Sequence, residues 1–235
     1  MTRNRRHAKA RPGRGTRVRV KTAKGRKLSS TRWLQRQFND PYVEAASREG
    51  YRSRAAYKLA ELDDRFGLLK QGAKVIDLGA APGGWTQVIA AATGAKNPAS
   101  GARVVAFDFS PMDPLEGAEI LTLDFLEDGA PEAIMERLGG PADAVLSDMA
   151  PAMTGHAKTD HLRIMALAEA AFEFAKEVLA PGGVFVAKML QGGTEQTLLA
   201  EMKACFAAVR HAKPPASRAD SSEIYVVATG FRAPK

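Results

Sequence analysis

The stretch KVIDLGAAPGGWTQV, residues 74–88, decides the fold that the sequence predicts. An apolar run passes through Asp77, a turn of small residues follows, and the chain continues through Gly83 and Gly84 into a helical pattern. A strand, a glycine-rich turn and a helix in this order are typical of an open α/β sheet, where ligands bind beyond the carboxyl ends of the strands. We therefore expect this turn to lie against a nucleotide-like ligand.

Runs rich in Val and Ile alternate with helical patterns along the rest of the chain. The predicted strands are residues 73–78, 103–108, 119–124, 143–148, 183–188, 206–211 and 223–229, and the predicted helices between them are residues 84–92, 131–138, 160–179 and 194–205. A further helix reaches Phe66 before the first strand, with Ser53 as its expected N-cap, and the run 180–183 is expected to stop the helix before the fifth strand. This alternation predicts a Rossmann-like α/β fold, with a seven-stranded, mostly parallel sheet and helices on both faces.

The charge of the chain is concentrated at one end. The net charge is +8, but residues 1–39 hold fourteen Lys and Arg and no acid, so they carry +14 and the remaining residues carry −6. With few large apolar side chains, residues 1–39 are predicted to be a disordered tail that binds RNA through its phosphates. A solubilising tail and an organelle transit peptide are the alternatives. Residues 40–235 are predicted to form a single domain.

Other features of the composition indicate a soluble, cytoplasmic protein. No apolar run reaches the length of a membrane span, and the single cysteine, Cys205, lies in an apolar helical pattern that indicates a core position. The four histidines show no spacing typical of a metal site, so no metal is expected. A monomer is expected because no exposed apolar stripe is evident.

The spacing of the glycines in the turn after the first predicted strand indicates which cofactor the protein binds. Gly79, Gly83 and Gly84 give the pattern G-x-x-x-G-G, which departs from the G-x-G-x-x-G of dinucleotide sites, and no P-loop lysine is present. This favours a ligand without phosphates, S-adenosylmethionine, over a turn that is glycine-rich for structural reasons only. Asp108, Asp124 and Asp148 lie at the ends of the next three predicted strands, where carboxylates could accept hydrogen bonds from the ligand.

Seven motifs together resemble one family of enzymes. The segments SRAAYKL, DLGAAPGGW, FDFSPMDP, LTLDF, SDMAP, FVAKML and KPPASRADSSEIYVVA are similar, in unbroken order, to the RrmJ family, also called FtsJ or RlmE. The resemblance implies an S-adenosylmethionine-dependent methyltransferase acting on the 2′-hydroxyl of a uridine ribose in large-subunit (23S) ribosomal RNA, within the 50S subunit. It also implies a catalytic tetrad of Lys58, Asp148, Lys188 and Glu223, and cofactor contacts from Gly83, Trp85, Asp108, Asp124 and Asp148. From the residues alone, Trp85 could equally pack its helix onto the sheet.

The chemistry of ribose methylation fits these residue types. A ribose hydroxyl becomes a good nucleophile only when a base takes its proton, and a lysine can do so only as a neutral amine, although lysine pKa is ordinarily about 10.4. A second cation nearby favours the neutral amine, whereas flanking carboxylates oppose it, so the sequence leaves the balance open. On this basis Lys188 is the expected general base, with Lys58, Asp148 and Glu223 around it.

Other functions remain as alternatives. SDMAP differs from the Asn/Asp-Pro-Pro-aromatic run of amine methylation, and Cys205 is badly placed for methylation at carbon 5 of a pyrimidine. The sequence also leaves open a transfer-RNA substrate and a non-catalytic RNA-binding assembly factor. A nicotinamide-dependent oxidoreductase is disfavoured by the missing G-x-G.

Overall fold

A computed structural model describes residues 28–125, 127, 129–152, 154–191 and 196–232. The α-helices are α1 (Leu28–Phe38), α2 (Pro41–Glu49), α3 (Ala55–Phe66), α4 (Gly84–Thr93), α5 (Ala130–Leu138), α6 (Ala157–Val178) and α7 (Gln196–Cys205). The strands are β1 (Lys74–Leu78), β2 (Arg103–Asp108), β3 (Glu119–Thr122), β4 (Ala142–Ser147), β5 (Leu179–Leu190), β6 (Phe206–Ala212) and β7 (Glu223–Phe231). A short 3₁₀ turn, Pro98–Ser100, precedes β2.

The strands form one sheet in the order β3-β2-β1-β4-β5-β7-β6. The pairs from β3 to β5 are parallel, and β7 lies antiparallel between β5 and β6. The predicted seven-stranded, mostly parallel sheet is therefore confirmed. The order changes direction at β1, whose two neighbours are β2 and β4, and this is the place where sheets of this kind bind ligands.

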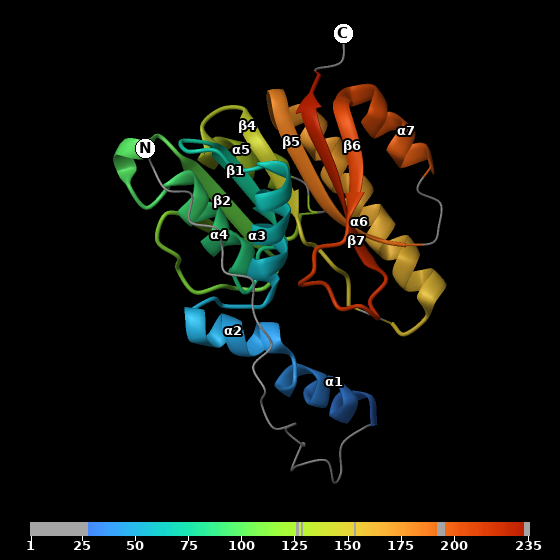
Figure 1. Ribbon diagram of the computed structural model, residues 1–235. Helices are drawn as coiled ribbons and strands as arrows, with labels where there is room; N and C mark the ends of the chain where they lie inside the picture. The colour runs from blue at the N-terminus through green and yellow to red at the C-terminus, as the bar shows by residue number, and fades with distance from the viewer. Residues whose placement is uncertain (1–27, 126, 128, 153, 192–195, 233–235) are drawn as a thin grey trace.

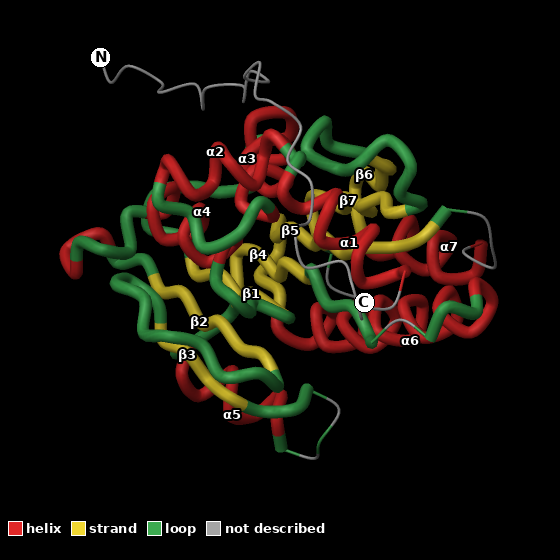
Figure 2. Tube along the Cα trace, turned by 90° about the horizontal axis from the view of Figure 1, so that it is seen from below, coloured by secondary structure: helices red, strands yellow, loops and turns green. Residues whose placement is uncertain are grey.

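Helices cover both faces of the sheet, as predicted (Figure 2). On one face, Leu59 of α3 and Ile89 of α4 belong to a buried cluster with strand residues such as Val75. On the other face, Ile134 of α5 and Phe172 of α6 belong to a second buried cluster. Two apolar layers of this size are what fixes an α/β sheet between its helices.

Helices α1 and α2 lie apart from these layers, beyond the lower edge of the sheet in Figure 1. The parallel strands end at that edge. The prediction of disorder is wrong for residues 28–38, because they form α1; residues 1–27 lie outside the described residues. The prediction failed there because it rested on the basic composition of residues 1–39 as a whole and not on the local pattern of residues 28–38.

Two element boundaries differ from the predictions. Ser53 is not an N-cap, because α3 begins at Ala55 after Arg54, which is already helical and makes no side-chain cap. Strand β5 begins at Leu179 rather than at residue 183, since Leu179 pairs with Ala142 before an irregularity in the register. Residues 180–183 therefore follow the end of α6 but belong to the strand.

None of the helices in the described part of the chain is both long and apolar enough to cross a membrane.

Candidate active site

The turn after β1, residues 79–83, is held tightly by its neighbours. The backbone N–H groups of Gly79 and Ala80 both donate to the carbonyl of Phe107, each at 3.0 Å. Gly79 has φ 75°, and a Cβ placed on it would lie 2.7–2.9 Å from atoms of Met149, backbone included. Glycine is required there because the turn packs directly against the chain leaving β4.

A cavity of about 520 Å³ opens beside this turn, and we call it the acidic cavity. Its lining combines carboxylates with apolar walls: Gly79, Ala81, Phe107, Asp108, Phe109, Ser110, Leu123, Asp124, Phe125, Asp148, Met149, Ala150, Pro151, Leu167 and Lys188. The volume lies in the range of small-molecule sites, and apolar walls with a few polar groups suit a nucleoside. Asp108, Asp124 and Asp148, the three aspartates at the ends of predicted strands, thus line one cavity.

Asp108 shapes the wall of the acidic cavity. Its carboxylate accepts hydrogen bonds from the backbone N–H of Ala81 at 3.0 Å and of Ser110 at 2.8 Å. The same side chain therefore fixes both the β1 turn and the start of the segment after β2. Its contact with a ligand ribose stays a prediction.

Gly83, Gly84 and Trp85 face protein rather than the acidic cavity. A Cβ on Gly84 would lie 2.2 Å from Oγ of Ser53, so the segment before α3 packs on this glycine. Trp85 is 2% exposed and its Nε1 donates to the carbonyl of Ala55 at 2.9 Å. These glycines are thus explained by packing, and the predicted cofactor contacts of the three residues remain predictions.

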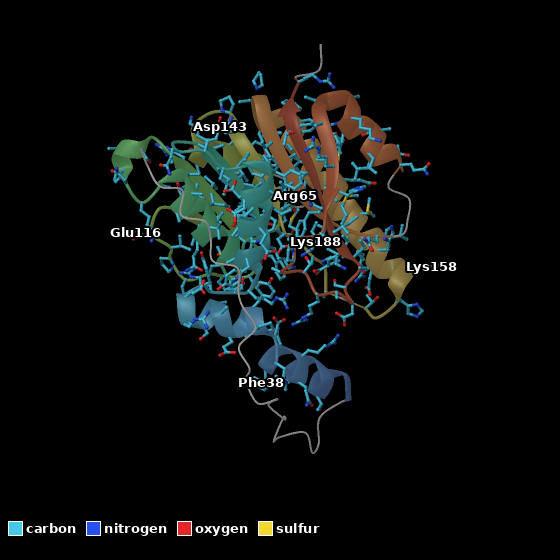
Figure 3. All side chains as sticks on the ribbon, viewed as in Figure 1. Phe38, Arg65, Glu116, Asp143, Lys158 and Lys188 are labelled. Atoms are coloured by element: carbon cyan, nitrogen blue, oxygen red, sulfur yellow. The ribbon has the colours of Figure 1, made fainter. Side chains whose placement is uncertain are left out.

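The four residues of the predicted tetrad come together as two linked ion pairs. Nζ of Lys188 lies 3.1 Å from Oδ1 of Asp148 and also donates to the carbonyl of Asp148 at 2.6 Å. Nζ of Lys58 donates to Oε2 of Glu223 at 3.1 Å. Lys188 is only 7% exposed and lies near the middle of the molecule at the lower end of β5 (Figure 3).

Tyr225 joins the two ion pairs, and the sequence analysis missed it. Its hydroxyl donates to Oδ1 of Asp148 at 2.7 Å, and Nζ of Lys58 lies 5.8 Å from the centre of its ring. Tyr225 pairs with Lys188 across the antiparallel strands and lies two residues after Glu223. Because side chains two apart share one face of a strand, this spacing was a usable signal.

The charges of the cluster stabilise each other. Burial alone would raise the pKa of Asp148, but the ammonium groups of Lys188 and Lys58 and the hydrogen bond from Tyr225 outweigh it and lower that pKa. Burial, with the adjacent Asp148 carboxylate, raises the pKa of Tyr225 well above its ordinary value. Asp148 is therefore ionised at neutral pH, where Tyr225 keeps its proton and donates a hydrogen bond to Asp148.

Asp77 lies inside the sheet near these groups. Its Oδ2 accepts a hydrogen bond of 2.6 Å from Thr86 on α4, while its buried Oδ1 has no hydrogen-bond partner among the described residues. Burial, opposed by the Thr86 hydrogen bond and assisted by Asp148 and Asp108, raises the pKa of Asp77 to about 7. This carboxyl is therefore partly protonated at neutral pH.

A second cavity, of about 290 Å³, reaches the tetrad from another side. We call it the basic cavity, and it is lined by Arg36, Gln37, Arg54, Ala55, Lys58, Arg218, Asp220, Ser221 and Glu223. A larger cavity of about 920 Å³, between α1–α2 and residues 215–220, shares Arg36, Arg54 and Arg218 with it. Asp148 and Lys188 line the acidic cavity while Lys58 and Glu223 line the basic one, so the tetrad lies where the two cavities approach each other.

The sequence profile of the family described as FtsJ-like methyltransferase matches residues 51–231. The chain belongs to the FtsJ-like methyltransferase family. Its S-adenosylmethionine-dependent methyltransferase fold and activity, predicted from the β1 turn and the motifs, are thereby confirmed. The match begins just before α3 and ends at the last residue of β7, so it contains the whole tetrad.

Two curated proteins similar to this FtsJ-like chain share the name "Ribosomal RNA large subunit methyltransferase E". The protein from Paramagnetospirillum magneticum is 63% identical over 215 residues, which cover 92% of this chain and 88% of the relative. The protein from Parvibaculum lavamentivorans is 60% identical over 224 residues, covering 93% and 88%.

A solved structure is also similar to this FtsJ-like methyltransferase. A protein described as a ribosomal RNA methyltransferase from Plasmodium falciparum has a TM-score of 0.69 and 29% identity, over 78% of this chain and all of that chain.

Within the described residues, no group of three His, Cys, Asp or Glu side chains is arranged to hold a metal ion.

Proposed function

We propose that the protein transfers the methyl group of S-adenosylmethionine to the 2′-hydroxyl of a uridine ribose in large-subunit (23S) ribosomal RNA. The membership of the family and the shared name of the curated relatives support a large-subunit ribosomal RNA substrate. One observation carries the choice of a ribose hydroxyl: the pairing of Lys188 with Asp148 and of Lys58 with Glu223, linked by Tyr225.

The residues of the acidic cavity suit the methyl donor. S-adenosylmethionine supplies an electrophilic methyl group when it is bound. Asp108 and Asp124 would accept hydrogen bonds from its hydroxyl and amine groups, and the apolar walls would contact its adenine. Phe109, which lines the cavity and is 74% exposed, offers a ring face at the entrance.

Lys188 is the proposed general base for the ribose hydroxyl. Its amine is held by two acceptors of Asp148, the carboxylate and the backbone carbonyl, so its direction is fixed before the acceptor RNA arrives. Tyr225 holds the Asp148 carboxylate in turn. Lys58, paired with Glu223, places a second positive charge near the Asp148 carboxylate. Proton transfer to a base oriented in this way typically contributes about 10²- to 10⁴-fold to the rate.

The acceptor RNA would approach through the basic cavity. Arg36, Arg54 and Arg218 line it together with Lys58. Arg54 and Arg218 share the single carboxylate of Asp40, so this wall keeps a net positive charge that attracts phosphates. A ribose placed at the inner end of this cavity would have its hydroxyl near Lys188, with the methyl donor on the far side of the tetrad. Because the acceptor is a ribose hydroxyl, an RNA strand rather than DNA is expected.

The test is a transfer assay on ribosomal subunits. The purified protein is incubated with S-adenosylmethionine labelled in its methyl group and with 50S subunits from a strain that lacks this methylation. The RNA is then digested to nucleosides and separated by chromatography. We expect the label in 2′-O-methyluridine, at no more than one methyl group per subunit.

Two results would contradict the proposal. Label in a base-methylated nucleoside would move the reaction away from ribose, and label in transfer RNA but not in 50S subunits would change the substrate. The Lys188→Met protein serves as the catalytic control. Lys158→Met, at an exposed position on α6, is the matched control for removing a lysine.

A further inference from the structure

The segment between α2 and α3 contains an arginine whose side chain is directed to the cofactor side of the molecule. The guanidinium of Arg52 donates to the backbone carbonyls of Pro82 at 3.4 Å, Asp113 at 2.8 Å and Pro114 at 2.7 Å. Pro82 belongs to the β1 turn, and Asp113 and Pro114 belong to the loop of residues 109–118 between β2 and β3. One side chain thus connects two segments that are far apart in the sequence.

These two segments both supply walls of the acidic cavity, and they meet at the Asp108 carboxylate. Gly79 and Ala81 of the turn line it, and so do Phe109 and Ser110 at the start of the loop. A Cβ on Gly83 would lie 2.9 Å from Nη1 of Arg52, so the guanidinium rests directly on the turn. The guanidinium of Arg52 therefore fixes the distance between residues 113 and 114 of the loop and the β1 turn.

The backbone of Arg52 is itself fixed to α4. Its N–H donates to Oε1 of Gln87 at 2.7 Å, and Nε2 of Gln87 donates to the carbonyl of Gly50 at 2.9 Å. An anchored backbone gives the guanidinium a defined origin, and a charged donor makes its hydrogen bonds to carbonyls stronger than neutral ones. The contact is therefore more than a chance surface arrangement.

We propose that Arg52 is a positioning residue for the methyl donor, because it clamps the β1 turn to the 109–118 loop and so keeps the two walls of the acidic cavity at binding distance. Without the clamp, binding has to order the loop, so affinity for the donor falls. Chemistry in the filled site is preserved, because the hydrogen bonds of Arg52 go to none of the four tetrad residues. This inference depends on the methyltransferase fold and not on which RNA atom is methylated.

Arg52 could instead contact RNA phosphates, because Arg54, two residues later, lines the basic cavity through which the RNA would approach. Arg54, however, is directed to the opposite side, where it pairs with the buried Asp40 and donates to the carbonyl of Ala216. The three hydrogen bonds of Arg52 given above occupy both of its terminal nitrogens with cofactor-side carbonyls. The two arginines of the sequence RSR therefore serve different sides of the site.

The experiment measures binding of S-adenosylhomocysteine by calorimetry without RNA, and then kcat and KM for S-adenosylmethionine with 50S subunits. The variants are Arg52→Gln, Arg52→Lys and Arg52→Ala. The control is Arg48→Gln on α2, whose side chain is 64% exposed and contacts Glu49. We expect the Kd and the KM for the donor to rise about tenfold in Arg52→Gln, with kcat at saturating donor within about twofold, and no change in the control.

Arg52→Lys and chemical rescue separate positioning from general destabilisation. An ammonium cannot reach three carbonyls in a fork, so Arg52→Lys is expected to keep the thermal midpoint but lose most of the affinity. Methylguanidinium at millimolar concentration should restore donor affinity to Arg52→Ala and leave Arg48→Gln unchanged. An unchanged donor Kd in Arg52→Gln overturns the proposal. A loss confined to RNA affinity would overturn it too, and would assign Arg52 to the RNA surface instead.

Discussion

Lys188 is held in place by two atoms of Asp148, the residue directly after β4, and this arrangement makes its role testable. Replacing Lys188 by Met keeps most of the side-chain volume but removes the amine that Asp148 holds. We expect methyl transfer to 50S subunits to fall by about 10²- to 10⁴-fold, the usual contribution of an oriented base. Binding of S-adenosylhomocysteine should change little. Turnover close to that of the unmodified protein would remove Lys188 from the role of base.

Tyr225 supports the tetrad without carrying a charge. Tyr225→Phe removes the hydroxyl that donates to Asp148 at 2.7 Å but keeps the ring beneath Lys58. We expect kcat to fall by about tenfold, the value of one hydrogen bond to a charged group, with unchanged donor binding. The profile of kcat against pH should also shift, because the charge of Asp148 is less well fixed. An unchanged rate and profile would show that Lys188 alone orients the carboxylate.

Asp77 makes stability depend on pH. Its pKa is about 7 in the folded protein and about 3.9 in an unfolded chain, so between these values only the folded state holds the proton. The free energy of unfolding therefore falls as pH rises through this window, by up to about 1.4 kcal/mol per pH unit, and levels off above pH 7. Asp77→Asn lacks this term, so we expect it to gain stability relative to the unmodified protein from pH 5 to pH 7.

Denaturant unfolding at several pH values measures this difference. Asp64→Asn, at an exposed site on α3, is the matched control for removing a carboxylate. A stability difference for Asp77→Asn that stays constant from pH 5 to pH 7 would contradict the assignment.

At the scale of elements, the β1 turn is packed so closely that it leaves no space for a side chain at Gly79. Gly79 and Gly67 both have positive φ, but a Cβ on Gly79 meets Met149 at 2.7–2.9 Å, whereas a Cβ on Gly67 meets nothing within 4 Å. Gly67→Ala should therefore cost only the backbone strain, about 1–2 kcal/mol. Gly79→Ala should cost a further 1–3 kcal/mol, roughly, for overpacking. Equal losses in denaturant unfolding would mean that the turn is not packed as described.

Most elements followed from local sequence pattern. Buried parallel strands are apolar on both faces, so runs such as VVAF and VFVA identified β2 and β5. The exceptions are two segments whose local sequence indicated a turn or disorder, whereas the folded chain forms a strand or a helix there. The residues Ala180–Gly183 read as a break, yet Leu179 pairs with Ala142 and extends β5 backwards. In α1, a composition without acids predicted disorder and concealed the helix.

The same distinction applies to the site. The tetrad and the three aspartates could be located from motifs and strand ends, because both are properties of short segments. Arg52 could not, because its acceptors lie 30, 61 and 62 residues away and depend on how three segments meet. The glycines at 79, 83 and 84 were interpreted as bare backbone for a ligand. Contacts with Met149, Arg52 and Ser53 give each of them a reason in packing, and their contact with the cofactor stays a prediction.

At the scale of the whole molecule, charge is divided between the basic first residues and the acidic remainder. Residues 1–27 contain twelve Lys and Arg and no acid. Deleting residues 2–27 leaves α1 and Arg36 in place, so we expect weaker binding to 50S subunits and a smaller slope of log K against log salt. Donor affinity should be unchanged. An unaltered salt slope, measured by filter binding from 50 to 300 mM salt, would show that these residues do not contact RNA.

The antiparallel strand β7 sits between β5 and β6 and supplies both Glu223 and Tyr225. Glu223, the ion-pair partner of Lys58, lies 165 positions later in the chain. During synthesis, Asp148 and Lys188 are therefore made before the residues of β7 that complete the cluster. Until β7 emerges from the translating ribosome, β5 also has an open edge. On the proposed function, a chain that ends before β7 lacks Glu223 and Tyr225, so we expect it to be inactive in methyl transfer until synthesis reaches that strand.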